Sequence, residues 1–109
     1  MIGQYSHFMI EARVEKKLVS MVRKMGGRAL KFESPGNAGV PDRIVMMPHG
    51  KIHFVELKAP GEKPRPLQVA VHEEFEALGF KVEVIDTPEG VEAFTRRLAE
   101  EQQEQQHGI

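Results

Sequence analysis

The sequence predicts an α/β fold in which helices flank a central mixed sheet of about four strands. Apolar residues recur at helical spacing in three stretches, and shorter apolar or alternating stretches typical of strands lie between them. Along the chain the elements follow the order α-β-β-β-α-β-α. The 109 residues suit one domain over 1–109, with its core at about 11–98 and a polar tail over 100–109.

The first half of the chain supplies a helix and three strands. In the helix, Leu18, Val22 and Met25 share one face, and Gly26-Gly27 ends it. Turn-forming residues separate the strands. We predict a helix over 7–26, strands over 28–33, 42–47 and 51–59, a loop over 34–41 and a turn over 48–50.

The second half alternates helix and strand. Pro66 suits the first position of a helix, and Gly79 suits the position after its end. A helix between two strands favours parallel pairing of those strands through a right-handed crossover. We predict helices over 66–78 and from 87 to about 98, a strand over 81–86 that pairs with 51–59, and a frayed tail over 100–109.

The composition excludes several classes of protein. No cysteine is present, so disulfide frameworks and thiolate metal sites are excluded, and any metal needs oxygen or imidazole ligands. No apolar run approaches the roughly 20 residues of a membrane span, and the first residues do not resemble a signal peptide. We therefore expect a cytoplasmic protein without a membrane partner.

Charge is distributed unevenly along the chain. Residues 1–68 contain 12 basic and 6 acidic residues, whereas residues 69–109 contain 3 basic and 10 acidic residues. This asymmetry has two interpretations: one surface prepared for a polyanion and another that avoids it, or two ordinary solvated faces. Charge alone does not decide between them.

The turn between the second and third strands determines whether three charged side chains meet. In a three-residue hairpin loop, Pro48 takes the first right-handed position and Gly50 takes a left-handed position that forms a bulge. This register sets Asp42 opposite Glu56, with β-carbons roughly 5 Å apart. Lys58 is two residues beyond Glu56 and points to the same face. A two-residue loop would instead send Asp42 to the other face.

Two neighbouring carboxylates repel one another unless a cation lies between them. Mg²⁺ or Mn²⁺ prefers a shell of oxygens, which Asp42, Glu56 and the backbone carbonyl of Leu57 can supply together with waters and phosphate. Such an ion polarises a phosphodiester and lowers the pKa of a coordinated water, while Lys58 orients the water or neutralises the transition state. The alternative is a surface cross-strand pair in which Lys58 forms a salt bridge with either carboxylate.

Four short motifs follow one another in a characteristic order and spacing. They are Asn-Ala-Gly-Val-Pro-Asp-Arg (37–43), Phe-Val-Glu-Leu-Lys-Ala-Pro (54–60), Arg-Pro-Leu-Gln (65–68) and Gly-Phe-Lys-Val-Glu-Val-Ile-Asp (79–86). Together they resemble the VRR-NUC domain of the PD-(D/E)xK nuclease superfamily, most closely its compact stand-alone form from phages. The resemblance covers about residues 11–98.

This resemblance implies a restriction-endonuclease-like sandwich and a set of site residues. Asp42 and Glu56 would be metal ligands, Lys58 the catalytic lysine, and Gln68 a polar residue that a helix brings near the site. The cofactor it implies is Mg²⁺ or Mn²⁺.

Two further assignments have plainer alternatives. Gln68 begins a helix, where phosphate also binds well, but it can equally be an ordinary first-turn polar residue. The family also has a glutamate on its first helix. Glu15, on the buried stripe with Leu18 and Val22, matches it better than Glu11, one turn earlier. Otherwise Glu15 is a surface residue with a buried stem.

Basic residues and one histidine border the expected site. Arg43, Lys63 and Arg65 are candidate phosphate contacts, or else ordinary solubilising residues. His72 lies one helical turn after Gln68 and either contacts the DNA backbone or is a partly exposed helix residue. The histidines are not clustered, so we predict no zinc site.

The expected function is that of a divalent-metal-dependent endodeoxyribonuclease, which hydrolyses phosphodiester bonds in structured DNA and recognises shape over sequence. The stand-alone family members are associated with cleavage of four-way (Holliday) junctions as homodimers, because two symmetric nicks need two sites. The alternatives are a flap- or nick-directed nuclease, a nuclease without structural preference, and a non-catalytic DNA-binding module. The resemblance also implies a phage-encoded protein that acts within a bacterial host.

Overall fold

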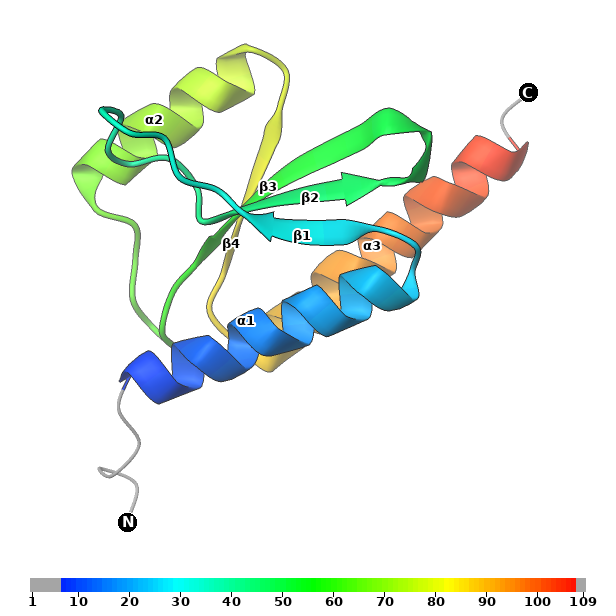
Figure 1. Ribbon diagram of the computed structural model, residues 1–109, viewed down its shortest axis with the longest axis horizontal. Helices are drawn as coiled ribbons and strands as arrows, with labels where there is room; N and C mark the ends of the chain where they lie inside the picture. The colour runs from blue at the N-terminus through cyan, green and yellow to red at the C-terminus, as the bar shows by residue number, and fades with distance from the viewer. Residues whose placement is uncertain (1–6, 108–109) are drawn as a thin grey trace.

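The helices and strands follow the predicted order in the structure, a computed structural model that describes residues 7–107 (Figure 1). Apart from the end of the last helix, their ends lie within two residues of the predicted ones. The elements are α1 (His7–Lys24), β1 (Arg28–Lys31), β2 (Arg43–Met47), the 3₁₀ turn η2 (Pro48–Gly50), β3 (Lys51–Leu57), α2 (Pro66–Ala77), β4 (Lys81–Ile85) and α3 (Pro88–His107).

The four strands form one mixed sheet in the order β1-β2-β3-β4. The first two pairings are antiparallel, and β3 pairs with β4 in parallel. A parallel pair needs a long connection between its strands, and α2 supplies it. The predicted α/β class and the parallel pairing are therefore confirmed.

The two faces of the sheet carry different side chains. α1 and α3 lie against one face and α2 lies over the other (Figure 1). Successive residues of a strand point to opposite faces. Val55 belongs to the core formed with α1 and α3, whereas the ring of Phe54 lies 4.8 Å from that of Phe75 in α2, centroid to centroid. Glu56, two residues beyond Phe54, consequently faces α2.

The main hydrophobic core lies between the sheet and the helix pair α1 and α3. Burial of each large side chain in such a core contributes about 1.5–3 kcal/mol. The core consists of Val14, Leu18, Val22, Ala29, Val45, Met47, Val55, Leu57, Ile85, Val91, Phe94 and Leu98.

No helix within residues 7–107 combines the length and the apolar character that crossing a lipid bilayer requires.

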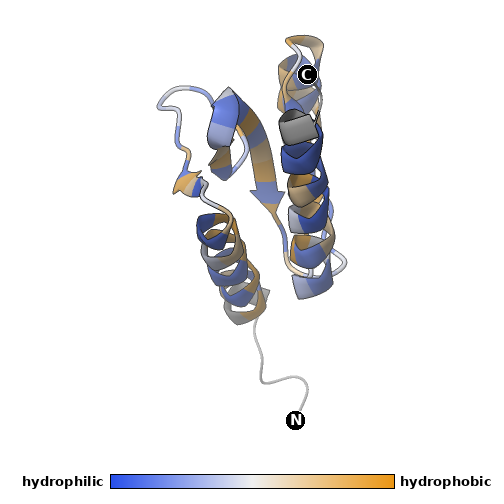
Figure 2. Cartoon of the chain, turned by 90° about the vertical axis from the view of Figure 1, so that its right-hand side faces the viewer, coloured by the Kyte–Doolittle hydropathy of each residue, from blue (hydrophilic) through white to orange (hydrophobic). Residues whose placement is uncertain are grey.

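The last helix differs from the expectation of a frayed tail over 100–109. α3 continues to His107; hydrophobic and hydrophilic residues share the helix (Figure 2), but its last eight residues, 100–107, are all polar. Glu101 Oε2 lies 3.2 Å from His53 Nε2, and Gln102 Nε2 donates a 3.1 Å hydrogen bond to the carbonyl of Met25. These polar contacts hold the helix beyond its last apolar residue. The apolar spacing alone therefore predicted an end of the helix that was too early. Residues 108–109 lie outside the described residues.

Candidate active site

The β2–β3 hairpin brings the two predicted carboxylates side by side. Met47 pairs with Lys51, and the register continues to the pair Arg43 and Val55. One further step sets Asp42 opposite Glu56, as the turn chemistry predicted.

The turn itself contains two left-handed residues. Gly50 has a φ of 73°, in agreement with the prediction. His49 also has a positive φ, 68° with a ψ of 26°, which the sequence did not indicate. A left-handed conformation at a residue other than glycine is uncommon. The turn keeps its three residues nevertheless, and with them the register of the hairpin.

Asp42 is held in place by both of its neighbouring strands. Its Oδ2 accepts a 2.8 Å hydrogen bond from the backbone N–H of Leu57, and its carbonyl accepts one of 2.8 Å from Phe32. The preceding loop lies tightly on α2, because a β-carbon at Gly39 would stand 3.0 Å from Val71 Cγ2. The carboxylate of Asp42 therefore has a fixed place at the end of β3.

Glu56 is buried and only partly satisfied. The residue is 2% exposed. Its Oε2 accepts a 2.9 Å hydrogen bond from Gln68 Nε2 and lies 3.4 Å from Lys58 Nζ. Its Oε1 has no hydrogen-bond partner and lies 3.7 Å from His72 Nε2, which also lacks one. An unpaired buried carboxylate oxygen is costly, and its presence points to a missing ligand.

The surroundings of Glu56 disfavour its charged form. Burial, and after it the negative charge of Asp42, raises the pKa of Glu56 to about 7 from an ordinary 4.5. The ammonium of Lys58 acts in the opposite direction without cancelling the effect. Two carboxylates held together in this way gain most from a cation placed between them.

The residues present fit a hard divalent cation. Asp42 and Glu56 offer carboxylate oxygens, Glu56 Oε1 is unpaired, and Leu57 lies beside Asp42 in the same pocket wall. Within residues 7–107 no group of three or more His, Cys, Asp or Glu side chains is arranged to hold a metal. Mg²⁺ needs no such cage, since it is commonly bound by one or two carboxylates and keeps several waters.

Two glutamates of α1 reach the cavity that contains Asp42. This cavity, of about 190 Å³ and hereafter the active-site pocket, is lined by Glu11, Glu15, Asp42 and Leu57 among others. Glu15 forms a salt bridge with Arg43: the Nη2 and Nε atoms of Arg43 lie 2.9 and 3.1 Å from Oε2 of Glu15. Glu11 interacts electrostatically with the site: burial raises the pKa of Glu11, and the negative charge of Asp42 raises it further. Sequence reasoning favoured Glu15 over Glu11, and the structure gives the two glutamates different partners.

Gln68 connects the first turn of α2 to the site. Its Oε1 accepts a 2.9 Å hydrogen bond from the backbone N–H of Arg65, and its Nε2 donates to Glu56. The residue is 7% exposed. Gln68 is therefore near the site, as the resemblance implied, and the alternative of an ordinary first-turn residue does not account for its bond to Glu56.

The four candidate DNA contacts fall into two groups. Lys63 and Arg65 are exposed in the segment that leads into α2, as a phosphate contact requires. Arg43 does not have this position: its side chain is 13% exposed, and its donors bind Glu15 and the carbonyl of Ala29. His72 is 8% exposed, so it is not a partly exposed helix residue and does not present its ring to a DNA backbone.

The sequence analysis did not predict the burial of His72, which it named only as a DNA contact or a partly exposed helix residue, or of His53. Burial lowers the pKa of His72, which favours a neutral ring against Glu56. The spacing of four residues from Gln68 placed both side chains on one side of α2, but it did not indicate that His72 would be buried against Glu56. His53 contacts Glu101 and lies at the other end of β3 from Glu56. No pattern in the sequence linked those two residues.

Comparison with known proteins gives two consistent matches. A curated phage protein described as "Putative nuclease p44", from Acyrthosiphon pisum secondary endosymbiont phage 1, is 60% identical over 77 residues, which are 71% of this chain and 83% of that protein. A solved structure described as a VRR_NUC domain superimposes with a TM-score of 0.75 and 34% identity, over 79% of this chain and 94% of the other. A scan against models of protein families found no match.

The two matches cover most of both partners and agree with the order of the four motifs. The solved domain is matched over nearly its whole length at a level of identity that goes beyond a shared fold. The hairpin register and the position of Gln68 agree with what the motifs implied. The chain belongs to the VRR-NUC nuclease family.

Proposed function

We propose that this protein is a divalent-metal-dependent endodeoxyribonuclease whose metal ligands are Asp42 and Glu56. One observation carries the proposal: two carboxylates meet on adjacent strands, and the buried one, Glu56, has an oxygen without a partner. Gln68 and Lys58 bind the other oxygen of Glu56 and leave Oε1 available.

Mg²⁺ or Mn²⁺ at this position would polarise the scissile phosphodiester and lower the pKa of a bound water. Its oxygen ligands would be Asp42, Glu56 and the backbone carbonyl of Leu57. Lys58 Nζ, 3.4 Å from Glu56, is placed to orient the attacking water or to neutralise charge that develops on the phosphorus oxygens. Gln68 fixes the orientation of the Glu56 carboxylate through its amide.

The carboxylates of α1 take two proposed roles. Glu11 lies in the same pocket as Asp42, and the charge of Asp42 affects its pKa. This position suits a residue that adds negative charge beside the cation. Glu15 is bound by Arg43 and acts through it, as a positioning residue that fixes the start of β2 beside Asp42. The resemblance alone favoured Glu15 as the site residue, and variants of each glutamate separate the two assignments.

The substrate we propose is structured DNA, with the four-way (Holliday) junction as the preferred form. Lys63 and Arg65 are exposed beside the helix that carries Gln68 and would contact phosphates there. Phosphate contacts set position without reading sequence, so shape would decide which DNA is cut.

Symmetric cleavage of a junction requires two active sites, which a homodimer would provide. An apolar row supports this proposal. Met46 pairs with Ile52, and the register between β3 and β4, continued by one residue, brings Phe80 beside Ile52. All three lie on the side of the sheet that faces α2, yet they are 39, 40 and 41% exposed. Burying such a row against a second copy would remove it from water.

The nuclease proposal is tested with labelled four-way junction, flap, nicked and plain duplex DNA in the presence of Mg²⁺ or Mn²⁺. The wild type should cleave, and fastest at the junction. Asp42→Asn and Lys58→Ala should fold and bind DNA but lose at least about 100-fold in cleavage rate. Lys51→Ala is the matched control, a lysine at the far end of the same strand, and should cleave normally.

Each alternative has its own outcome in this assay. Preference for the flap or nick, or none, would replace the junction proposal and leave the nuclease chemistry. DNA binding without cleavage under any cation would favour the non-catalytic module. Cleavage at the wild-type rate by Asp42→Asn or Lys58→Ala would remove the site assignment.

The dimer is tested by sedimentation of the wild type and of Ile52→Glu. We expect a dimer for the wild type and a monomer for the variant. Val69→Glu, which changes a similarly exposed apolar residue of α2, should leave the dimer intact. A monomeric wild type at micromolar concentration would contradict the proposal.

A further inference from the structure

A groove along α1 adjoins the active-site pocket. The groove, of about 510 Å³, is bordered by Lys16, Ser20 and Arg23 of the helix and by Arg43 of β2. Glu15 lines both the groove and the active-site pocket. The groove and the active-site pocket therefore adjoin at Glu15, so one DNA strand could contact both.

The cationic residues of the groove follow helical spacing. Lys16, Ser20 and Arg23 are separated by four and three residues, so they form one stripe on α1. The seven steps from Lys16 to Arg23 span about 10 Å of helix axis at 1.5 Å per residue. One DNA strand covers that axial distance with about three nucleotides, since its charges are about 3.4 Å apart along the duplex.

The positive charge of the groove is not balanced by the protein. Its carboxylate, Glu15, is neutralised by Arg43 at 2.9 Å. Lys16 and Arg23 are exposed and make no ion pair with the side chains that the structure describes. By contrast Lys17, the next residue along α1, is paired with Glu92 at 3.3 Å. The groove therefore offers two uncommitted cations to a polyanion.

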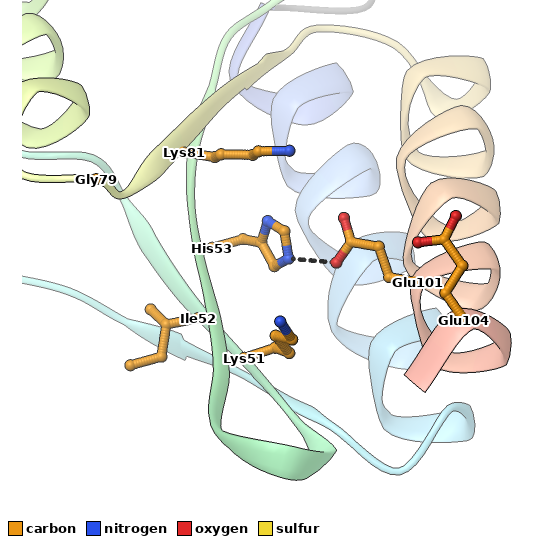
Figure 3. Close-up of a pocket in the computed structure, with 7 residues that line it drawn as sticks. All are labelled: Lys51, Ile52, His53, Gly79, Lys81, Glu101 and Glu104. Atoms are coloured by element: carbon orange, nitrogen blue, oxygen red, sulfur yellow. Dashed lines mark hydrogen bonds and ion pairs between the residues drawn. The ribbon is translucent and has the colours of Figure 1, made fainter. Parts of the chain in front are cut away.

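A second pocket differs from the groove because its lining contains as many acidic as basic side chains, apart from His53. It has a volume of about 440 Å³ at the hairpin end of β3, where Lys51 and Lys81 face Glu101 and Glu104 across it (Figure 3). The pocket thus holds two lysines and two carboxylates, so its formal charge is balanced, although the described side chains form no lysine–carboxylate ion pair there and Glu101 contacts His53. The five steps from Lys51 to Glu56 also place this pocket roughly 17 Å from the active site along the strand. A DNA strand would gain little from it.

We propose that the groove along α1 binds the phosphodiester backbone of the DNA strand that enters the active-site pocket. Lys16 and Arg23 contact phosphates, and the hydroxyl of Ser20 donates to the backbone between them. The inference rests on the proposed nuclease function and adds the path along which the substrate strand lies beside the site. Contacts of this kind are independent of sequence and weaken with salt.

The test compares two double variants that each remove two positive charges, Lys16→Gln with Arg23→Gln in the groove and Lys51→Gln with Lys81→Gln in the balanced pocket. Binding of fluorescently labelled duplex and four-way junction DNA is measured by anisotropy between 50 and 200 mM salt, about the range over which phosphate contacts are lost, with EDTA present to prevent cleavage. All positions are exposed, and thermal melts confirm folding.

The groove variant should bind at least about 10-fold more weakly than the wild type, and the slope of log affinity against log salt should be smaller by about 2. The control variant should keep both affinity and slope within about twofold. At low DNA concentration with Mg²⁺ the groove variant should also cleave more slowly than the wild type, because it binds less of the DNA.

Two results would contradict the proposal that the groove binds DNA. Neither would contradict the proposed nuclease function, provided that the wild type cleaves. One is an unchanged affinity and slope in the groove variant. The other is an equal loss in the control variant, which would mean a general charge effect. A wild type that neither binds nor cleaves DNA would overturn the nuclease function together with the groove.

Discussion

Gln68 Nε2 donates a 2.9 Å hydrogen bond to Glu56 Oε2, and this bond ties the first turn of α2 to the strand that carries the candidate site. The other end of the same amide accepts from the backbone of Arg65, so the amide has one orientation that satisfies both contacts. Gln68 thus decides which oxygen of Glu56 stays available.

Replacing Gln68 should therefore damage cleavage more than folding. Gln68→Ala frees the Glu56 carboxylate to rotate, and we expect a 10- to 100-fold loss in activity or in metal affinity, about the usual effect of removing a residue that orients a ligand. Cleavage rate and Mn²⁺ dependence are the measurements. Gln102→Ala, which removes a glutamine that bonds to Met25 far from the site, is the control. Equal cleavage by both variants would show that Gln68 has no orienting role.

The raised pKa of Glu56 gives stability a specific dependence on pH. The folded protein holds the proton of Glu56 up to about pH 7, while the unfolded chain releases it near 4.5. Between these values the folded state binds more protons, so the free energy of unfolding falls as pH rises. The penalty is fully present above pH 7 and absent well below 4.5.

Glu56→Gln should remove this penalty. In EDTA we expect the variant to be more stable than the wild type at pH 8, by on the order of 1–3 kcal/mol, with a much smaller difference at pH 5. Urea unfolding at the two pH values is the measurement. Glu83→Gln, which alters a carboxylate paired with Arg97 on the surface, should show no such gain. A stabilisation of the same size at both pH values would contradict the pKa argument.

The polar anchors of α3 should contribute to stability and not to cleavage. The double variant Glu101→Ala with Gln102→Ala removes the contact to His53 and the hydrogen bond to Met25. We expect it to unfold about 1–2 kcal/mol more easily and to cleave DNA at the normal rate at 25 °C. Thermal or urea unfolding measures the first effect and the DNA assay the second. An unchanged stability would mean that the helix end is held by other contacts.

The hairpin could be predicted from the sequence because local chemistry determines it. A proline and a glycine around His49 favour a three-residue turn, and the turn alone sets which residues of the two strands face each other. Asp42 and Glu56 were therefore placed together before any long-range contact was known. The left-handed conformation of His49 was not predictable in this way, since a non-glycine residue rarely adopts it.

Contacts between distant elements were harder to predict. Glu11 and Glu15 differ by one helical turn, and only the position of α1 against β2 assigns Arg43 to one of them. His72 and Glu101 are polar, and polar residues are mostly found in solvent, so their contacts with Glu56 and His53 went unrecognised. A linear pattern indicates which face of a helix is apolar, but not which polar residues on its border find a partner.

The direction of α3 also determines where a second protein could be attached. The helix begins just after β4, near the end of the sheet that carries Glu56, and reaches His53 at the hairpin end thirteen residues after Pro88. That distance is roughly 20 Å of helix, and the C-terminal end of α3 lies on the side of the molecule where the β2–β3 hairpin turns (Figure 1). A reporter or affinity tag fused there would leave the candidate site open to DNA, whereas a fusion ahead of α1, whose Glu11 lines the active-site pocket, would be closer to it.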